Sequence, residues 1–146
     1  MNPQPLVTRV KSPAQLLLCK GCCCGRTDRG LPAVPVERIK SIWKAEKLNR
    51  AVQLTISGCL GPCDLPNVAV VVTAASMEWF GRLEDDAAYD ALITWARECF
   101  AAGTIVPLPA TLNAHRFSRF EIGEGEGGAL LVRGDGSPRD SVPKSA

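Results

Sequence analysis

Seven cysteines are the residues of this chain best suited to chemistry, and six of them lie in two short segments. The first segment reads Cys19-Lys20-Gly21-Cys22-Cys23-Cys24, and the second reads Cys59-Leu60-Gly61-Pro62-Cys63. Glycine and proline favour tight turns, so we expect the second segment to be a loop that presents two thiols together. Thiolates are metal ligands and redox-active nucleophiles. The pattern therefore indicates a metal site or a thiol redox site.

The compartment expected from the sequence supports the same chemistry. Residues 1–11 lack the apolar segment and cleavage site of a secretory signal, and no apolar run approaches the roughly 20 residues of a membrane span. We therefore expect a cytoplasmic protein with no membrane segment. Thiols stay reduced in the cytoplasm, and an odd number of cysteines fits poorly with a closed set of disulfides.

Short apolar segments alternate with helical patterns along the chain. Strands are expected at 15–18, 51–56, 67–73 and 77–81, where apolar and β-branched residues lie between turn formers. One amphipathic helix is expected over 35–48, and a second is expected between the acidic residues 84–86 and Gly103. The fold class is therefore α/β, a small mixed sheet with flanking helices, in which the first two strands form a parallel crossover.

This pattern divides the chain into four parts. Residues 1–14 form an N-terminal lead-in, and residues 15–103 form the folded domain that carries both cysteine segments. Residues 104–122 are expected to be an arm that packs on the body or on a partner. Residues 123–146 are rich in Gly, Ser and Pro, so we expect a disordered tail.

Both cysteine segments directly follow strands that a helix is expected to connect. A [2Fe–2S] cluster needs four ligands, normally thiolates, and two loops at neighbouring strand ends supply donors from two directions. We therefore expect the two segments to close on one iron–sulfur cluster. His115 is the only histidine, which excludes a Rieske-type centre with two histidine ligands within one chain.

The spacing Cys19-x4-Cys24, followed after 34 residues by Cys59-x3-Cys63 and a valine-rich strand, resembles that of the thioredoxin-like [2Fe–2S] ferredoxins. This family includes the small cluster-binding subunit of respiratory complex I and of some hydrogenases. The resemblance covers residues 15–103 and implies a thioredoxin-like fold, one-electron transfer rather than enzymatic catalysis, and frequent homodimers. By carry-over it implies the ligands Cys19, Cys24, Cys59 and Cys63.

The chain also departs from the family pattern. Cys22 and Cys23 lie inside the first segment, so either one can replace Cys24 as a ligand. The sequence has no counterpart of the helical extension expected of the complex I subunit, and so it resembles a free-standing ferredoxin. The run from Cys19 to Arg119 is also similar to small ferredoxins encoded among cobalamin genes, which suggests a role in cobalamin or cobalt metabolism.

Two other readings of the cysteines stay open at this point. Structural zinc requires four tetrahedral ligands, and Cys19, Cys22, Cys59 and Cys63 have suitable spacing. A thiol–disulfide oxidoreductase would use Cys19 and Cys22 as a C-x-x-C pair. That reading leaves Cys59 and Cys63 without a role. Cys99 falls near the apolar face of a helix, so we expect it to be a small buried apolar residue.

The charge distribution bears on partners. Residues 1–50 hold ten Lys and Arg against three Asp and Glu, a formal charge of +7, whereas residues 51–146 carry −5. We expect an acidic redox partner to dock near Lys20, Arg26 and Arg29, because opposite charge accelerates encounter. These three cations should also raise the reduction potential of a nearby cluster. The low aromatic content gives no sign of nucleic-acid binding.

Overall fold

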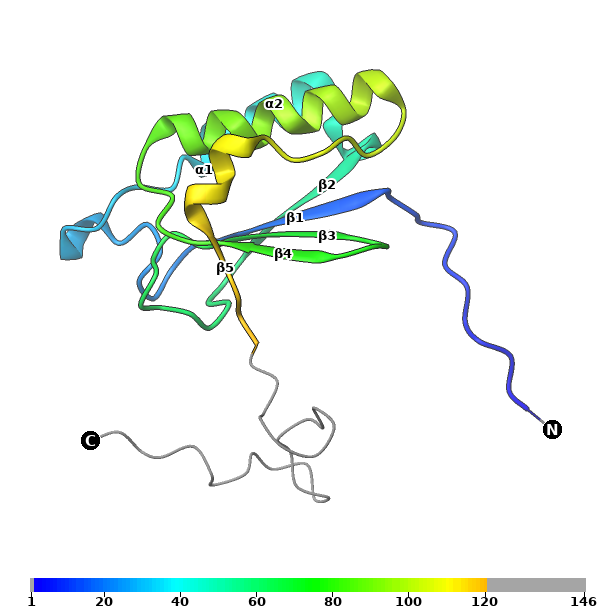
Figure 1. The fold of residues 1–146 in the computed structure, drawn as a ribbon, viewed down its shortest axis with the longest axis horizontal. Helices are drawn as coiled ribbons and strands as arrows, with labels where there is room; N and C mark the ends of the chain where they lie inside the picture. Colours follow the sequence, from blue (N-terminus) through cyan, green and yellow to red (C-terminus); the bar gives the residue numbers. More distant parts are fainter. Residues whose placement is uncertain (1, 121–146) are drawn as a thin grey trace.

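The computed structural model describes residues 2–120, and the tail expected over 123–146 lies outside them. The described chain forms one five-stranded sheet with the order β2-β1-β3-β4-β5 (Figure 1). The strands are β1 (Ala14–Cys19), β2 (Val52–Ser57), β3 (Ala69–Thr73), β4 (Met77–Phe80) and β5 (Arg116–Phe117). Strand β1 pairs parallel with β2 and antiparallel with β3, and β4 pairs antiparallel with both β3 and β5.

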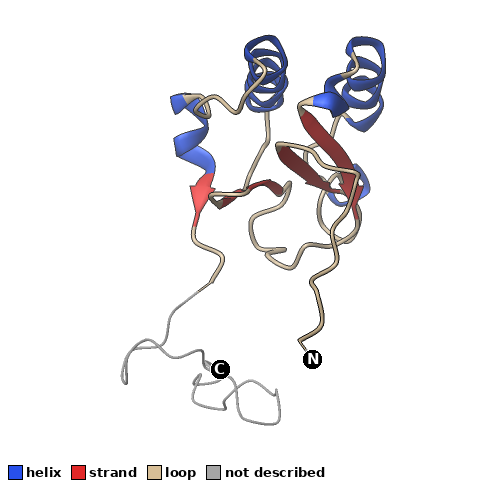
Figure 2. Ribbon diagram, turned by 90° about the vertical axis from the view of Figure 1, so that its right-hand side faces the viewer, coloured by secondary structure: helices blue, strands red, loops and turns tan. Residues whose placement is uncertain are grey.

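Two helices cover one face of this sheet, as both ribbon views show (Figures 1 and 2). Helix α1 (Val36–Glu46) is the crossover between β1 and β2, and helix α2 (Asp86–Ala102) follows β4. Asp85 caps the N-terminus of α2 by accepting a hydrogen bond from Ala88 N–H, and Gly103 ends the helix in a left-handed conformation. The predicted α/β class, mixed sheet and helices are confirmed.

The core lies between the sheet and the helices. Leu16 and Leu18 on β1 point toward the helices and are 1% exposed, because alternate residues of a strand face opposite sides. Trp43 of α1 is buried in the same layer, and its indole N–H donates to the carbonyl of Val52 at 2.8 Å. This bond ties the crossover helix to the start of β2 and so fixes the end of the sheet where the parallel pair begins.

The segment after α2 packs against the body rather than extending from it. Trp95 of α2 is completely buried and donates from its indole N–H to the carbonyl of Val106 at 2.7 Å. Leu112, in a 3-10 turn over Ala110–His115, is also completely buried. Strand β5 then adds to the edge of the sheet beside β4, a pairing that the sequence did not predict. Cys99 is 1% exposed beneath this segment, which confirms its predicted apolar role.

Within residues 2–120, no helix is long and apolar enough to cross a membrane.

Replacing Leu112 by alanine tests whether the segment after α2 is part of the cooperative fold. We expect Leu112→Ala to lower the free energy of unfolding by about 2–5 kcal/mol, because it leaves a cavity in a fully buried position. Urea denaturation followed by circular dichroism measures this change. Thr111→Ala, in the same turn but exposed, is the control; equal stability of the two variants would show that the segment is only loosely attached.

Candidate metal centre

The two cysteine segments meet at one end of the sheet because the strands that precede them pair in parallel. In the register of this pair Cys19, the last residue of β1, lies beside Ser57, the last residue of β2. The pairing continues past the strand ends, where Lys20 N–H donates to the carbonyl of Ser57 at 2.9 Å. The first cysteine loop therefore starts directly beside the second.

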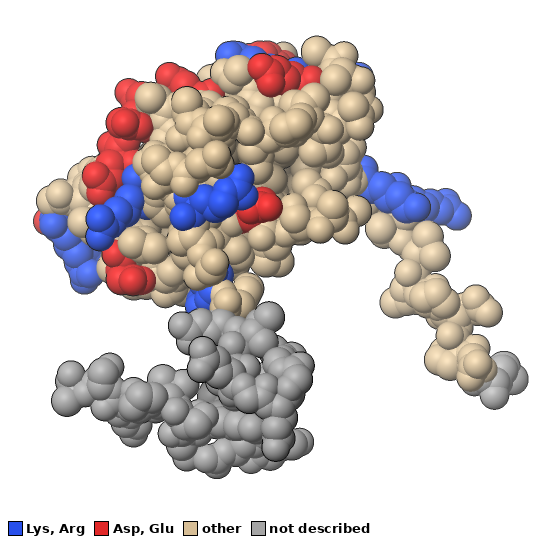
Figure 3. Space-filling view, in the orientation of Figure 1, with Lys and Arg blue, Asp and Glu red and all other residues tan. Residues whose placement is uncertain are grey.

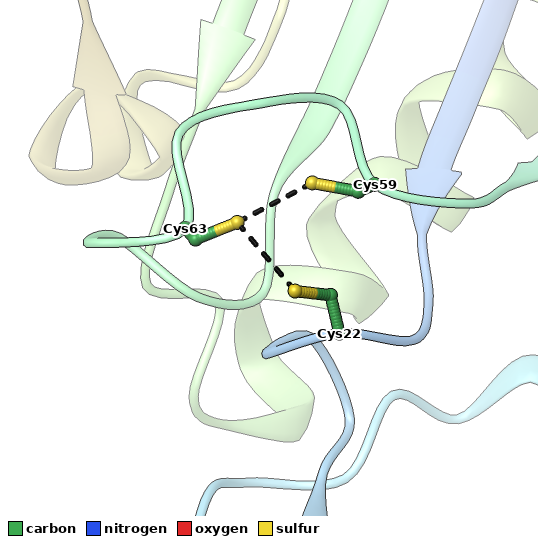
Figure 4. Close-up of side chains that lie close together, drawn as sticks. All are labelled: Cys22, Cys59 and Cys63. Carbon is green, nitrogen blue, oxygen red and sulfur yellow. Dashed lines mark hydrogen bonds between the residues drawn. The ribbon is translucent and has the colours of Figure 1, made fainter.

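Three sulfur atoms converge at this point (Figure 4). The Sγ atoms of Cys22, Cys59 and Cys63 all lie within 4.8 Å of one another. The Sγ of Cys63 is 3.3 Å from that of Cys59 and 4.0 Å from that of Cys22. Cys22 and Cys59 are exposed and Cys63 is half-buried, so this group faces solvent.

The other two predicted ligands lie deeper. Cys19 and Cys24 are 3% and 2% exposed and belong to the hydrophobic core. Burial and the adjacent Cys24 thiol raise the pKa of Cys19 to about 12, and the backbone N–H of Leu60 in the second loop acts against this rise. Cys59 is also close enough to raise the pKa of Cys19. Cys19 and Cys24 thus lie in the core and outside the group of three thiols that are within 4.8 Å of one another among the described residues.

Local hydrogen bonds give the first loop its shape. Gly21 and Cys24 exchange two backbone hydrogen bonds of 2.9 and 3.0 Å, which close a tight turn around Cys22 and Cys23. Cys22 adopts a positive φ of 52°, an uncommon conformation for a residue with a side chain. Arg26 donates to the carbonyl of Cys22 at 3.1 Å and pairs with Asp28. The turn directs Cys22 toward the second loop, whereas Cys24 points into the core.

The second loop is organised around Gly61. Its φ is +117°, a conformation that favours glycine, and its carbonyl accepts a hydrogen bond from Cys63 N–H at 2.8 Å. A hydrogen bond from Cys63 and another from the Gly61 N–H lower the pKa of Cys59. The pKa of Cys63 shifts in the opposite direction, because hydrogen bonding to Cys59 and Cys22 raises it to about 12. The ionisation equilibria of Cys59 and Cys63 are therefore linked through the direct contact of the two thiols.

The side chain of Asn67 connects the two cysteine loops by hydrogen bonds in the core. Asn67 is completely buried, although its side chain is polar. Its Oδ1 accepts a hydrogen bond from Gly25 N–H at 2.7 Å, directly after the first cysteine segment. Its Nδ2 donates to the carbonyls of Pro32 at 2.9 Å and Leu83 at 3.2 Å. One side chain therefore connects the first loop, the end of the second loop and the segment that leads into α2.

The donor set fits a thiophilic metal centre. Thiolate sulfur is the preferred ligand of iron–sulfur clusters and a common ligand of zinc. Six thiols lie in the two cysteine segments at this end of the sheet: two are buried in the core, two are exposed and two are half-buried. Two sulfurs bound to one metal at about 2.3 Å are about 3.8 Å apart, and the two measured Sγ–Sγ distances lie on either side of this value.

The structure thus brings Cys59 and Cys63 of the predicted ligands into one group, adds Cys22 to them, and places Cys19 and Cys24 in the adjacent core. Cys23 is half-buried and belongs to no such group among the described residues. The C-x-x-C pair Cys19 and Cys22 is not followed directly by a helix, since α1 begins only at Val36.

Sequence reasoning missed two residues of this region. Asn67 falls at the start of a predicted strand, and an asparagine that follows a proline indicates a turn rather than a buried hydrogen-bonding role. Arg119 alternates with aromatic residues in the arm that is expected to pack on the body or on a partner, but nothing in the sequence indicates its contact with the second cysteine loop.

No protein-family model, no curated protein and no solved structure matches this chain. The assignment of the site therefore depends on its own geometry and chemistry.

Replacing Asn67 by alanine tests its role as the link between the loops. We expect Asn67→Ala to lower the free energy of unfolding by about 3 kcal/mol, because the Gly25 N–H loses its acceptor in a buried position. The measurement is urea denaturation of the reduced, metal-free protein. Asn113→Ala is the control, since Asn113 is exposed and makes only one long hydrogen bond, of 3.4 Å. A loss below about 0.5 kcal/mol for Asn67→Ala, the size typical of surface substitutions, would contradict this role.

Proposed function

We propose that this protein is a one-electron carrier that binds a [2Fe–2S] cluster through the thiolates of Cys19, Cys24, Cys59 and Cys63. The observation that supports the proposal is the register of the parallel pair, which puts two cysteine loops side by side at the ends of β1 and β2. The resemblance of the ligand spacing to that of thioredoxin-like ferredoxins supports the same cofactor.

The four proposed ligands form two pairs. Cys59 and Cys63 are in contact on the second loop, and Cys19 and Cys24 are neighbours on the first loop. Cys19 lies near Cys59, so the pairs are adjacent. Four thiolates in two pairs are the donor set that a two-iron cluster requires. When bound, the cluster would supply a metal site that accepts and releases one electron.

The residues around these thiols would control the environment of the centre. The core around Cys19 and Cys24 excludes water from one side, while Cys59 is exposed on the other. The backbone amides of Leu60 and Gly61 act to lower the pKa of Cys19 and Cys59, respectively, and would stabilise negative charge on these sulfurs. Solvent access and hydrogen bonds to sulfur are main determinants of cluster potential. Because one side of the centre would face the core and the other would face solvent, an electron would leave through the exposed loops.

An acidic redox partner would dock at these exposed loops. Lys20 and Arg29 are exposed beside the first loop, whereas Arg26 is bound to Asp28 and to the Cys22 carbonyl. On the face drawn in Figure 3, basic side chains alternate with acidic ones and do not form one continuous basic surface. An acidic partner would therefore dock through a small number of basic side chains of this protein close to the metal centre. A cytoplasmic location, a homodimer and a role in cobalamin or cobalt metabolism belong to the same proposal.

Structural zinc is the second candidate, and one observation favours it. The compact group of three thiols includes Cys22 rather than Cys24, and three thiolates within 4.8 Å already form most of a tetrahedral zinc site. Cys19 is the fourth cysteine of the zinc set. The two candidates therefore differ in one ligand, Cys24 for the cluster and Cys22 for zinc.

Single cysteine-to-serine variants distinguish the candidates. If the cluster proposal is correct, Cys24→Ser loses most of the bound iron, while Cys22→Ser keeps the iron content of the wild type. The measurement is the iron, sulfide and zinc content of protein purified without oxygen, together with circular dichroism to verify folding. Cys23→Ser is the matched control, because Cys23 lies between the two positions and outside the sulfur group among the described residues.

The reverse result would exclude the proposed ligand set. Loss of metal from Cys22→Ser together with wild-type metal content in Cys24→Ser would assign Cys22 to the site. If the metal in question were zinc, the protein would be a structural or binding module rather than an electron carrier.

A further inference from the structure

The segment that ends the described chain lies against the second cysteine loop. A Cβ atom placed on Gly61 would lie 2.5 Å from Nη2 of Arg119 and 3.4 Å from its Cζ. The guanidinium therefore occupies the space where a side chain at Gly61 would be. Arg119 is 58 positions away along the chain, so β5 and the residues after it bring it here.

Aromatic rings hold the guanidinium in this position. Its Cζ lies 5.7 Å from the ring centroid of Trp79 and 5.4 Å from that of Phe120, distances at which cation–π attraction is significant. The rings of Trp79 and Phe120 pack edge-to-face at 5.9 Å. Within residues 2–120, no carboxylate lies within ion-pairing distance of Arg119. Its charge is therefore not neutralised by an acidic neighbour in this part of the chain.

The contact of Arg119 with Gly61 can influence both Cys59 and Cys63. The carbonyl of Gly61 accepts the Cys63 N–H at 2.8 Å, and Gly61 is the middle residue between Cys59 and Cys63. A displacement of Gly61 would therefore change the backbone path to both cysteines. A contact that restrains Gly61 therefore restrains the spacing of the pair.

A second contact fixes the other end of the same loop. A Cβ atom on Gly81 would lie 2.9 Å from Cβ of Leu65 and 3.2 Å from Cε1 of Phe117, so Leu65 and β5 enclose this glycine. Gly81 N–H donates to the His115 carbonyl, and Arg82 N–H donates to the Leu65 carbonyl. The segment 115–120 thus contacts the second loop directly at Gly61 and, through Gly81, at Leu65.

From this geometry we propose that Arg119 is a positioning residue of the metal centre, which holds the Cys59–Cys63 loop through Gly61 and places a positive charge beside it. This inference rests on the proposed metal centre at that loop. It assigns to the segment after α2 a role in the site, in addition to its packing. Arg116, three positions earlier, pairs with Glu78 and lies over Phe80, so it provides a control with the same charge and no loop contact.

The first experiment measures hydrogen exchange of the peptide covering residues 58–66 in the full chain, with and without its metal. We expect exchange in Arg119→Gln to be at least about five-fold faster than in the wild type, because the substitution removes the exposed cation–π contacts with both Trp79 and Phe120. Arg116→Gln should exchange at the wild-type rate. Equal exchange in wild type and Arg119→Gln would overturn the proposal.

The second experiment separates the charge from the packing. In the metal-loaded protein, Arg119→Gln should lower the midpoint potential, because a positive charge near the centre favours the more negative reduced form, and Arg119→Lys should restore it. A potential that is the same in all three proteins would overturn the electrostatic part of the proposal. If the wild type binds no metal, the proposed function fails, while the exchange rates of the metal-free chain still decide whether Arg119 holds the loop.

A double-mutant cycle tests the contact itself. Gly61→Ala should accelerate removal of the metal by a chelator, both because φ is +117° and because the new methyl group meets the guanidinium. Removing the guanidinium in Gly61→Ala/Arg119→Ala should recover part of this loss. Strictly additive effects of the two substitutions would show that Arg119 and Gly61 do not interact and would overturn the proposal.

Discussion

The side chain of Asn67 is the constraint on which the candidate site depends. A buried amide must satisfy its donors and acceptor within the protein, and Asn67 does so with backbone groups of Gly25, Pro32 and Leu83. Its own φ is +29°, close to the left-handed region that asparagine tolerates better than most residues. Because the partners are backbone atoms, the amide fixes the path of the loops without depending on the cysteines or on any metal. The loops that carry the candidate site are therefore held by hydrogen bonds within the polypeptide.

The arrangement of the thiols follows from this scaffold. The parallel pair of β1 and β2 sets the two loops side by side, and the turn closed by Gly21 and Cys24 sends neighbouring cysteines in different directions. Cys24 enters the core, whereas Cys22 faces the second loop. Residues 19–24 therefore place some of their thiols in the core and others at the surface. The two proposed ligand sets differ only in their use of this segment, Cys24 for the iron–sulfur cluster and Cys22 for zinc.

Much of the fold could be predicted from the sequence because the signals were local. The valine-rich strand, the amphipathic helix over α1 and the Asp85 and Gly103 caps of α2 all follow from residue type and spacing, and all are present. The meeting of the two cysteine loops also followed, since a helix between two strands implies a parallel crossover. Strand β5 could not be predicted, because its two residues pair with β4 across a distance of more than 35 positions. The contact of Arg119 with Gly61 depends on that pairing, so it could not be predicted from the sequence either. The sequence also did not predict which cysteines of the first segment are buried and which are exposed.

The most direct test of the central claim is the visible absorption spectrum of anaerobically purified protein, combined with electron paramagnetic resonance after reduction by dithionite. The account predicts visible bands that bleach on reduction and a rhombic S = 1/2 signal from one reduced [2Fe–2S] cluster per chain. A colourless protein with one equivalent of zinc and no paramagnetic signal would contradict it and would assign these thiols to a structural site.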